Sequence, residues 1–299
     1  MGNNIKYLIV IVGPTAVGKT SFSIQLAKHY HCDIISADSR QFYKEMLIGT
    51  AKPTSNEMQG VRHHFIDSHK VTETFSAGRF EVAALQLLEE LYKKRDIVIL
   101  TGGSGLYVKA LCEGMNDIPA VPKCYRDALY DELAKEGLDP LVAELKSVDP
   151  LYFDKVDKKN QQRVIRALEV YRATGQPYSQ FRDDKPRERS FSIIRIGLDL
   201  NRKSLFERID RRVDEMVDDG LFDEVERLRQ YRNVYALQTV GYKEVFGFLD
   251  GDYDRVEAIR LIKRNTRRYA KRQLTWFKRD PDIHWFQPDQ MKDIIRLCP

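Results

Sequence analysis

The sequence predicts an α/β fold in which a parallel sheet is interrupted by a helical insertion and followed by C-terminal helices. Short apolar runs such as Tyr7–Val12 alternate with amphipathic stretches such as Phe80–Lys93. This alternation is typical of a parallel sheet with crossover helices. Residues from about 123 to 188 are helical, charged and poor in strand signals, which return at Phe191–Leu200. From Ser204 onward the periodicity is helical.

The first elements of the sheet are the clearest. Tyr7–Val12 is apolar throughout, as expected for a strand that is buried on both faces. A glycine-containing loop over residues 13–20 separates it from a predicted helix at Ser21–Tyr30. Further strands are predicted at Asp33–Ala37, His64–Ile66 and Asp96–Leu100.

The change in composition near residue 117 predicts two domains. Ile118–Pro122 (IPAVP) contains two prolines among apolar residues, and such a segment suits a hinge. The core is expected to comprise residues 1–116 and 190–299, and the helical insertion residues 117–189.

Composition excludes several classes of protein. The 299 residues are 42% hydrophobic and 31% charged, a globular balance. No apolar run reaches the roughly 18 residues of a membrane span. Four scattered cysteines without a CxxC pair argue against a zinc ribbon or a disulfide framework. We therefore expect a cytoplasmic, monomeric protein without a membrane partner.

Charge is concentrated near the C-terminus. The whole chain has 49 Lys and Arg residues and 44 Asp and Glu residues, but Arg255–Arg279 holds ten basic residues and only one acid, Glu257. Such a run suits a polyanionic partner. RNA phosphates are the favoured interpretation, because the helix itself holds almost no acidic residues that could pair with these cations. A solvated helix face is the alternative.

The loop after the first strand has the GxxxxGK[ST] pattern of a P-loop. Its backbone N–H groups and the following helix N-terminus can surround an anion, Lys19 adds a cation, and Thr20 can hold Mg²⁺. The expected diphosphate-binding residues are Gly13, Pro14, Thr15, Ala16, Val17, Gly18, Lys19 and Thr20. The core is thus predicted to be P-loop NTPase-like.

An acid expected of a nucleotide hydrolase is missing. The strand Asp96–Leu100 runs into Thr101-Gly102-Gly103, which has no carboxylate to organise water. Asp38 instead follows the strand at residues 33–37. Strand ends of a parallel sheet face one crevice, so Asp38 and Thr101 should face the P-loop ligand. A helix cap or an indirect Mg²⁺ contact is the alternative role for Asp38.

An ordered set of motifs resembles the tRNA dimethylallyltransferases, the MiaA family of isopentenyltransferases. Besides the P-loop, the matching segments are residues 36–41 (SADSRQ), 48–53 (IGTAKP), 101–107 (TGGSGLY), 162–169 (QRVIRALE), 240–243 (VGYK) and 271–277 (KRQLTWF). The resemblance covers nearly the whole chain.

This resemblance implies a reaction. The family transfers a dimethylallyl group from dimethylallyl diphosphate to the exocyclic amine (N6) of the adenine 3′-adjacent to the anticodon of tRNA, and releases diphosphate. The P-loop, Lys19 and Mg²⁺ on Thr20 would stabilise the leaving diphosphate, and Asp38 would act as general base.

The resemblance also implies roles for individual residues. Catalytic roles fall on Asp38, Lys19, Thr20, Ser104 and Arg208, and His63 resembles a position near the diphosphate. Contacts with tRNA fall on Asp38, Ser39, Arg40, Gln41, Thr101, Ser104, Arg126, Gln162, Arg163, Val164, Ile165, Arg166, Gln238, Thr239, Val240, Gly241, Tyr242, Lys243, Lys271, Arg272, Gln273, Leu274, Thr275, Trp276, Phe277 and Lys278. For His63 and Arg208, a purely structural role is an equal alternative.

Three other functions compete with this one. A small-molecule P-loop kinase would share the glycine loop and could use Arg208 or Arg212 as a lid arginine. An isopentenyltransferase acting on free AMP or ADP would not need the basic C-terminal helix. A non-enzymatic RNA-binding protein would not need an intact P-loop.

Overall fold

The computed structural model describes residues 5–183 and 185–299. The chain divides into two compact units. The core unit comprises Met1–Gly114 and Glu188–Pro299, and the insertion unit comprises Met115–Arg187. Within the described ranges, no helix is long and apolar enough to span a membrane.

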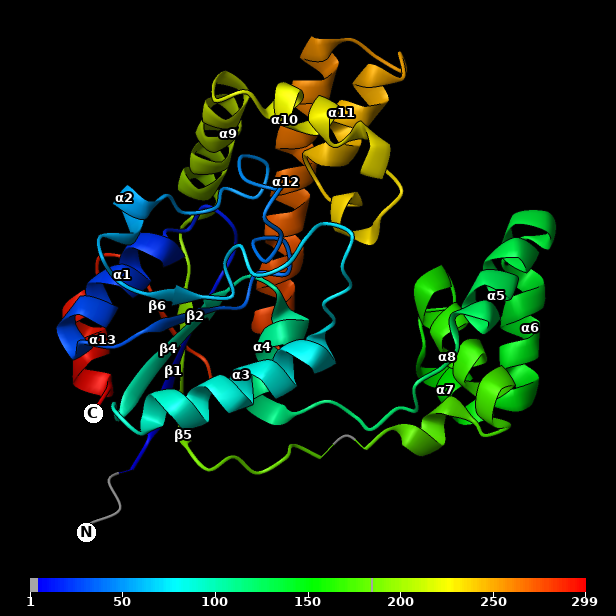
Figure 1. Ribbon diagram of the computed structural model, residues 1–299, viewed down its shortest axis with the longest axis horizontal. Coiled ribbons are helices and arrows are strands. Elements are labelled where there is room, and N and C mark those ends of the chain that lie inside the picture. The colour runs from blue at the N-terminus through cyan, green and yellow to red at the C-terminus, as the bar shows by residue number, and fades with distance from the viewer. Residues whose placement is uncertain (1–4, 184) are drawn as a thin grey trace. The chain divides into compact units, whose positions relative to one another are not determined.

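A six-stranded sheet forms the centre of the core unit (Figure 1), with strand order β3-β2-β4-β1-β5-β6. All neighbouring strands run parallel. The strands are β1 (Tyr7–Val12), β2 (Ile34–Ser36), β3 (His63–His64), β4 (Ile97–Gly102), β5 (Ser192–Leu198) and β6 (His284–Phe286). The predicted α/β class with a parallel sheet is confirmed.

Helices cover both faces of this sheet. In the core unit they are α1 (Lys19–Tyr30), α2 (Ser55–Met58), α3 (Ala77–Tyr92), α4 (Gly105–Glu113), α9 (Arg202–Asp218), α10 (Leu221–Arg227), α11 (Tyr242–Leu249), α12 (Arg255–Phe277) and α13 (Met291–Leu297). Alternate residues of β1 explain the two layers. Leu8 and Val10 pack with α3 and α4, whereas Ile9 and Ile11 pack with α1, α9 and α13. The unbroken apolar run of β1 is therefore buried on both faces.

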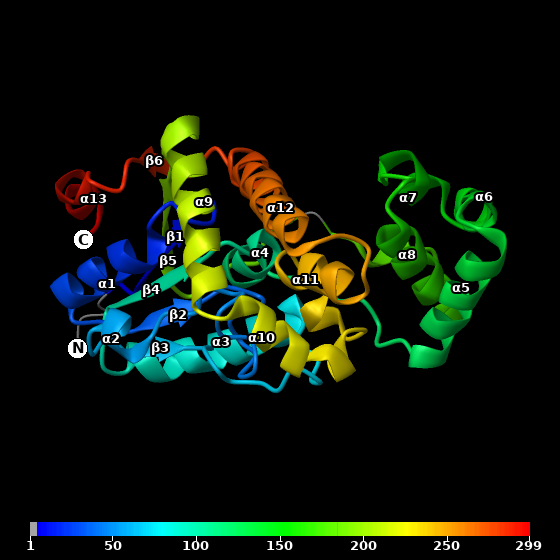
Figure 2. The same cartoon turned by 90° about the horizontal axis from the view of Figure 1, so that it is seen from above.

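A third apolar cluster joins the C-terminal helices to the segment after β2. It contains Leu221 of α10, Val245 of α11 and Ile262 of α12, together with Tyr43 and Met46. Helices α9 and α12 lie side by side in both views (Figures 1 and 2), where Lys263 and Arg267 of α12 pair with acids of α9. The C-terminal helices are thus packed against the segment that follows β2.

The insertion unit has its own core. Its helices are α5 (Lys123–Glu136), α6 (Asp139–Val148), α7 (Pro150–Lys155) and α8 (Gln161–Thr174). Leu129, Leu145 and Leu168 are buried at its centre. Arg172 of α8 pairs with Glu132 of α5 and with a glutamate of α6, which ties three helices together.

The structure corrects some expected boundaries. The strand expected at His64–Ile66 is β3, His63–His64, and ends before Phe65, whose φ of 61° leaves the extended region. The expectation of helix alone after Ser204 is wrong at β6, which pairs with β5. This strand is only three residues long, too short to show a period of two.

Candidate active site

The P-loop follows β1 and leads directly into α1. Gly13 has a φ of 147°, and a Cβ there would collide with the carbonyl of Leu198 on β5. Gly18 has a φ of 107° and forms the N-cap of α1. Both conformations favour glycine, so the pattern of the sequence has a direct cause in the turn of the backbone. The loop places the N-terminus of α1 at the carboxyl end of the sheet.

Lys19 is enclosed by this loop. Its Nζ donates hydrogen bonds to the carbonyls of Gly13 (3.0 Å) and Pro14 (2.8 Å). The pKa of Lys19 is lowered to about 7, mainly by burial; the carboxylate of Asp38 partly opposes this shift, and the positive charge of Arg212 adds to it. A bound anion would restore the charged ammonium.

Two arginines of α9 point at the same loop. Arg208 Nη1 donates to the carbonyl of Val17 at 3.1 Å, and Arg212 Nη1 donates to Oγ1 of Thr15 at 3.2 Å. Burial lowers the pKa of Arg212 from its ordinary value. From the sequence, Arg212 was expected only as a lid arginine of a rival kinase. Its spacing of four from Arg208 nevertheless places both side chains on one face of a helix.

Asp38 lies where β2 ends, beside the end of β4. The amide of Ala37 donates to the carbonyl of Thr101 at 2.7 Å, so the two strand ends are adjacent. Asp38 Oδ1 accepts the amide of Arg40 at 3.0 Å. No partner of its Oδ2 is present among the described residues. Asp38 also lines the cavity described below, so this oxygen is available there as a hydrogen-bond acceptor.

Ser104 holds the segment that follows Asp38. Its Oγ accepts the amide of Ser39 at 2.9 Å and donates to the Ser39 hydroxyl at 3.0 Å. Ser39 follows Asp38 directly in the chain. The Ser104 hydroxyl therefore positions the backbone next to Asp38.

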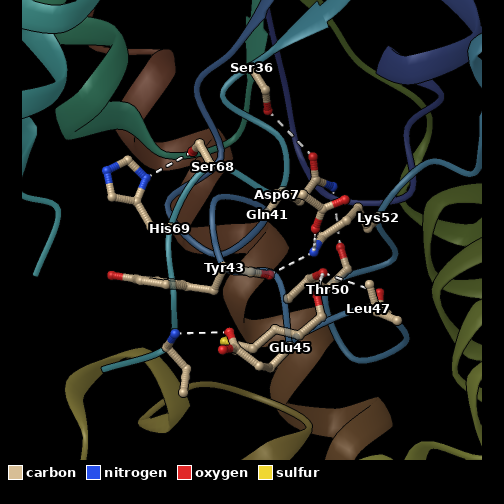
Figure 3. Close-up of polar contacts among 12 residues, drawn as sticks. Ser36, Gln41, Tyr43, Glu45, Leu47, Thr50, Lys52, Asp67, Ser68 and His69 are labelled. Atoms are coloured by element: carbon tan, nitrogen blue, oxygen red, sulfur yellow. Dashed lines mark hydrogen bonds and ion pairs between the residues drawn. The ribbon is translucent and has the colours of Figure 1, made fainter. Parts of the chain in front are cut away.

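Residues 47–52 form one wall of the site, which we call the cavity wall. Figure 3 shows its polar contacts with the segment after β2. Gln41 Nε2 donates to the carbonyls of Thr50 and Ala51, both at 3.3 Å. Lys52 Nζ donates to the carbonyl of Tyr43 at 2.6 Å and pairs with Asp67 at 2.5 Å. The charge of Lys52 is thereby neutralised.

Gln273 connects α12 to the P-loop. Its Oε1 accepts the amide of Thr15 at 2.8 Å, and its Nε2 donates to the carbonyl of Gly103 at 2.9 Å. The side chain is 6% exposed. It was expected to contact tRNA, but its polar atoms are used inside the core unit. Sequence alone gave no signal for this bridge, because a single glutamine in a helix has no pattern.

These residues surround a cavity of about 1020 Å³. It is lined by Thr15, Ala16, Gly18, Lys19, Thr20, Asp38, Gln41, Thr101, Arg208, Arg212, Tyr269 and Gln273, among others. His63 does not line it. Its Nδ1 contacts the carbonyl of Val61 at 2.9 Å, and its Nε2 is buried without a partner. A position of His63 near the diphosphate stays a prediction, and these contacts agree with the structural role that was its alternative.

The segments expected to bind tRNA differ in exposure. Side chains that reach the surface include Gln162, Arg163, Gln238, Lys243, Lys271, Arg272, Thr275, Trp276 and Lys278. In the same segments Val164, Ile165, Tyr242 and Phe277 are buried. Those four pack in the apolar clusters, so the expected RNA contact does not extend to their side chains.

In the insertion unit, two of the expected tRNA residues share one acid. Glu169 is 1% exposed and accepts both Nε and Nη2 of Arg126, at 2.5 and 2.7 Å. It also accepts Arg166. Two guanidinium groups against one carboxylate leave a net positive charge at this point. Arg163, one turn earlier, is exposed.

The site defines the class of protein. A glycine loop between a parallel strand and a helix, with a lysine and two arginines directed at it, is a P-loop built to hold a polyphosphate. The family model described as "IPP transferase" matches residues 41–280, and the chain belongs to that family.

Relatives are similar over almost their full length. The tRNA dimethylallyltransferase of Cytophaga hutchinsonii is 53% identical over 289 residues, which cover 97% of this chain and 95% of that protein. The tRNA dimethylallyltransferase 1 of Bacteroides thetaiotaomicron is 46% identical over 288 residues, covering 96% and 94%.

Solved structures share the fold. The full-length tRNA isopentenylpyrophosphate transferase of Bacillus halodurans is 41% identical, with a TM-score of 0.70 over 98% of this chain and 94% of that chain. A eukaryotic dimethylallyltransferase, described as acting on tRNA, is 28% identical, with a TM-score of 0.80 over 96% and 75%.

Proposed function

We propose that this protein transfers a dimethylallyl group from dimethylallyl diphosphate to N6 of the adenine 3′-adjacent to the anticodon in tRNA, releasing diphosphate. The observation that carries the proposal is the cavity that places Lys19, Arg208 and Arg212 around the P-loop and Asp38 beside it. Full-length similarity to proteins named tRNA dimethylallyltransferase supports the choice of substrates.

The cations stabilise the leaving group. As the allylic C–O bond breaks, negative charge grows on the diphosphate. The P-loop amides and the side chains of Lys19, Arg208 and Arg212 are already directed at the loop to receive that charge, and such preorganised groups lower the barrier most.

Asp38 takes the proton. The exocyclic amine must lose a proton once it has formed the new C–N bond, and Oδ2 of Asp38 can accept it. No acid follows β4 to activate a water molecule. The cavity therefore favours transfer to an amine over hydrolysis of the diphosphate.

Magnesium fits the donor set near the P-loop. Thr20 is exposed, lines the cavity and offers a hydroxyl oxygen, a hard donor of the kind that Mg²⁺ prefers. Among residues 5–183 and 185–299, no three His, Cys, Asp or Glu side chains converge as metal ligands. Mg²⁺ would therefore be held jointly by Thr20 and the substrate phosphates, and it would neutralise diphosphate charge.

RNA contacts are proposed for two surfaces. One is the exposed, basic part of α12, with Lys271 and Arg272. The other is the face of the insertion unit that carries Arg126, Arg163 and Arg166. Phosphate contacts from such side chains would position the stem-loop, and the target base must leave its stack to reach Asp38. We further propose a monomer that works in the cytoplasm, where tRNA is modified.

A transfer assay tests this proposal against its rivals. The protein is incubated with Mg²⁺ and dimethylallyl diphosphate labelled in the allyl group, together with either tRNA or AMP. Label is expected in tRNA, at an N6 position, and not in AMP. Label in AMP alone would support a free-nucleotide transferase. Phosphoryl transfer from ATP to a small molecule, without prenylation, would support the kinase.

A further inference from the structure

One buried carboxylate of the core unit takes no part in the chemistry above. Glu224, on α10, is 2% exposed. Its Oε2 accepts the amides of Leu47 (2.9 Å) and Ile48 (2.8 Å), and its Oε1 accepts the amide of Gly49 (3.0 Å) and the hydroxyl of Tyr242 (2.6 Å). None of these partners is a cation. Four neutral donors compensate the buried charge, and such a charge is costly unless it is fully hydrogen-bonded.

Three of those donors belong to the cavity wall. The next two residues of the wall, Thr50 and Ala51, are held by side chains from other segments. Gln41 donates to the carbonyls of Thr50 and Ala51, and Arg212 Nη2 approaches the Ala51 carbonyl at 3.5 Å. Arg212 also donates to Thr15 of the P-loop. A short chain of contacts therefore leads from Glu224 through the wall to a cation of the diphosphate site.

Tyr242 fixes the wall from the side of α11. Its ring is fully buried, and a Cβ at Gly49 would lie 2.5 Å from it. Only glycine allows this approach. The same tyrosine donates to Glu224, so packing and hydrogen bonding hold residues 47–49 against α10 and α11 together. These contacts restrict the backbone of residues 47–49.

We propose that Glu224 is a positioning residue for the diphosphate cavity. It fixes the backbone of residues 47–49, and thereby keeps the carbonyls of Thr50 and Ala51 where they orient Gln41 and Arg212. This inference rests on the proposed function, because it assumes that the cavity takes a diphosphate. Glu224 does not touch the ligand in this account.

Glu244 provides a matched control. It is also a buried glutamate of the C-terminal helices, 6% exposed, and it accepts the amide of Gly241 and Nδ2 of Asn265. Within the part of the chain that the structure describes, it makes no hydrogen bond to a residue of the cavity wall. Glu224→Gln and Glu244→Gln each remove one buried negative charge without changing side-chain size. Both should therefore lower the thermal midpoint, but only the first disturbs the wall.

The test measures binding of inorganic pyrophosphate with Mg²⁺ by calorimetry, at a temperature where both variants are folded. Glu224→Gln should weaken binding by about tenfold or more, since small displacements in a preorganised site are costly. The KM for dimethylallyl diphosphate should rise by a similar factor. Amide exchange at residues 47–49 should accelerate in this variant alone. Glu244→Gln should keep the wild-type pyrophosphate affinity.

Equal affinities in wild type and Glu224→Gln would overturn the positioning role, and so would equal losses in the two glutamine variants. If Glu224→Gln does not fold, Gly49→Ala serves instead, because it forces the wall away from Tyr242 while keeping the carboxylate. Unchanged pyrophosphate affinity in Gly49→Ala would then contradict the inference. A wild-type protein that binds no pyrophosphate would instead overturn the proposed function itself.

Discussion

Two groups of cations in the core unit are suited to phosphate, but their environments are opposite. In the cavity Lys19 and Arg212 are only partly exposed and are hydrogen-bonded to the P-loop, and desolvation lowers the pKa of both. On α12, Arg268, Lys271 and Arg272 are exposed to solvent. Buried cations act at short range on a reacting group, whereas exposed cations act on a polyanion and are screened by salt. The first group suits chemistry and the second suits binding.

Helix α12 itself divides into two parts. Lys263 pairs with Asp214 and Arg267 with Asp210, both acids of α9, and Arg260 pairs with an acid of its own helix. In the described chain, Arg268, Lys271 and Arg272 have no carboxylate partner. A basic run in a sequence therefore overstates the free charge, because a neighbouring helix can supply the acids that the run lacks.

The largest effect is expected at the acid in the cavity. Asp38→Asn keeps the shape of the side chain but cannot accept the amine proton, so kcat should fall by about 10²–10⁴-fold. Affinity for tRNA should remain. Single-turnover transfer and filter binding measure the two quantities. Loss of tRNA binding with an intact rate at saturating tRNA would make Asp38 a recognition residue.

Removal of the Lys19 side chain should have the next largest effect. Lys19→Ala deletes a charge beside the leaving diphosphate and should lower kcat by about 10²–10³-fold. Because Lys19 Nζ is hydrogen-bonded to P-loop carbonyls inside the cavity, whereas Arg268, Lys271 and Arg272 are exposed to solvent, tRNA affinity should not change. Circular dichroism checks that the variant is folded. Normal turnover by a folded variant would exclude Lys19 from the chemistry.

The two parts of α12 should respond differently to substitution. Changing Arg268, Lys271 and Arg272 together to Ala should weaken tRNA binding by about tenfold or more and flatten its dependence on salt, because fewer counterions are released. The matched triple variant replaces the paired residues Arg260, Lys263 and Arg267. It should leave the salt slope close to that of wild type, because those charges are already neutralised. If tRNA binding by the two triple variants had the same dependence on salt, the paired and the unpaired cations of α12 would not differ in their contribution to RNA binding.

The smallest effect is the pH dependence of the cavity. The pKa of Lys19 is lowered to about 7 in the free protein, so its ammonium is lost as the pH rises through 7, and a bound diphosphate must restore that proton. Affinity for pyrophosphate should therefore fall above pH 7, by at most about tenfold per pH unit. The comparison is with Lys19→Arg, whose charge does not titrate in this range. The ratio of the two affinities cancels the ionisation of the ligand.

A ratio that stays constant from pH 6 to 9 would contradict the lowered pKa. The same linkage predicts the stability of the free protein. Above pH 7 the unfolded chain binds a proton at Lys19 that the folded chain has lost, so this residue makes the free energy of unfolding rise with pH. Lys19→Met should lack that contribution between pH 7 and 9.

Features fixed by local pattern were predictable from the sequence. The first strand and the P-loop turn follow from an unbroken apolar run and from two glycines with positive φ. Contacts made across the fold were not predictable. Glu224 sits in a helix like any solvated glutamate, and Gln273 bridges two loops more than 150 residues away along the chain. The partners of α12 belong to another helix, so its sequence alone could not reveal them.

The most direct test measures kcat and the KM for tRNA in two variants side by side. Lys19→Ala should lower kcat and keep the affinity for tRNA. The triple variant at Arg268, Lys271 and Arg272 should raise the KM for tRNA and reach the wild-type kcat at saturating tRNA. That result would separate chemistry in the cavity from binding on α12. If both variants changed the same kinetic parameter, it would be wrong to assign chemistry to the cations of the cavity and tRNA binding to the exposed cations of α12.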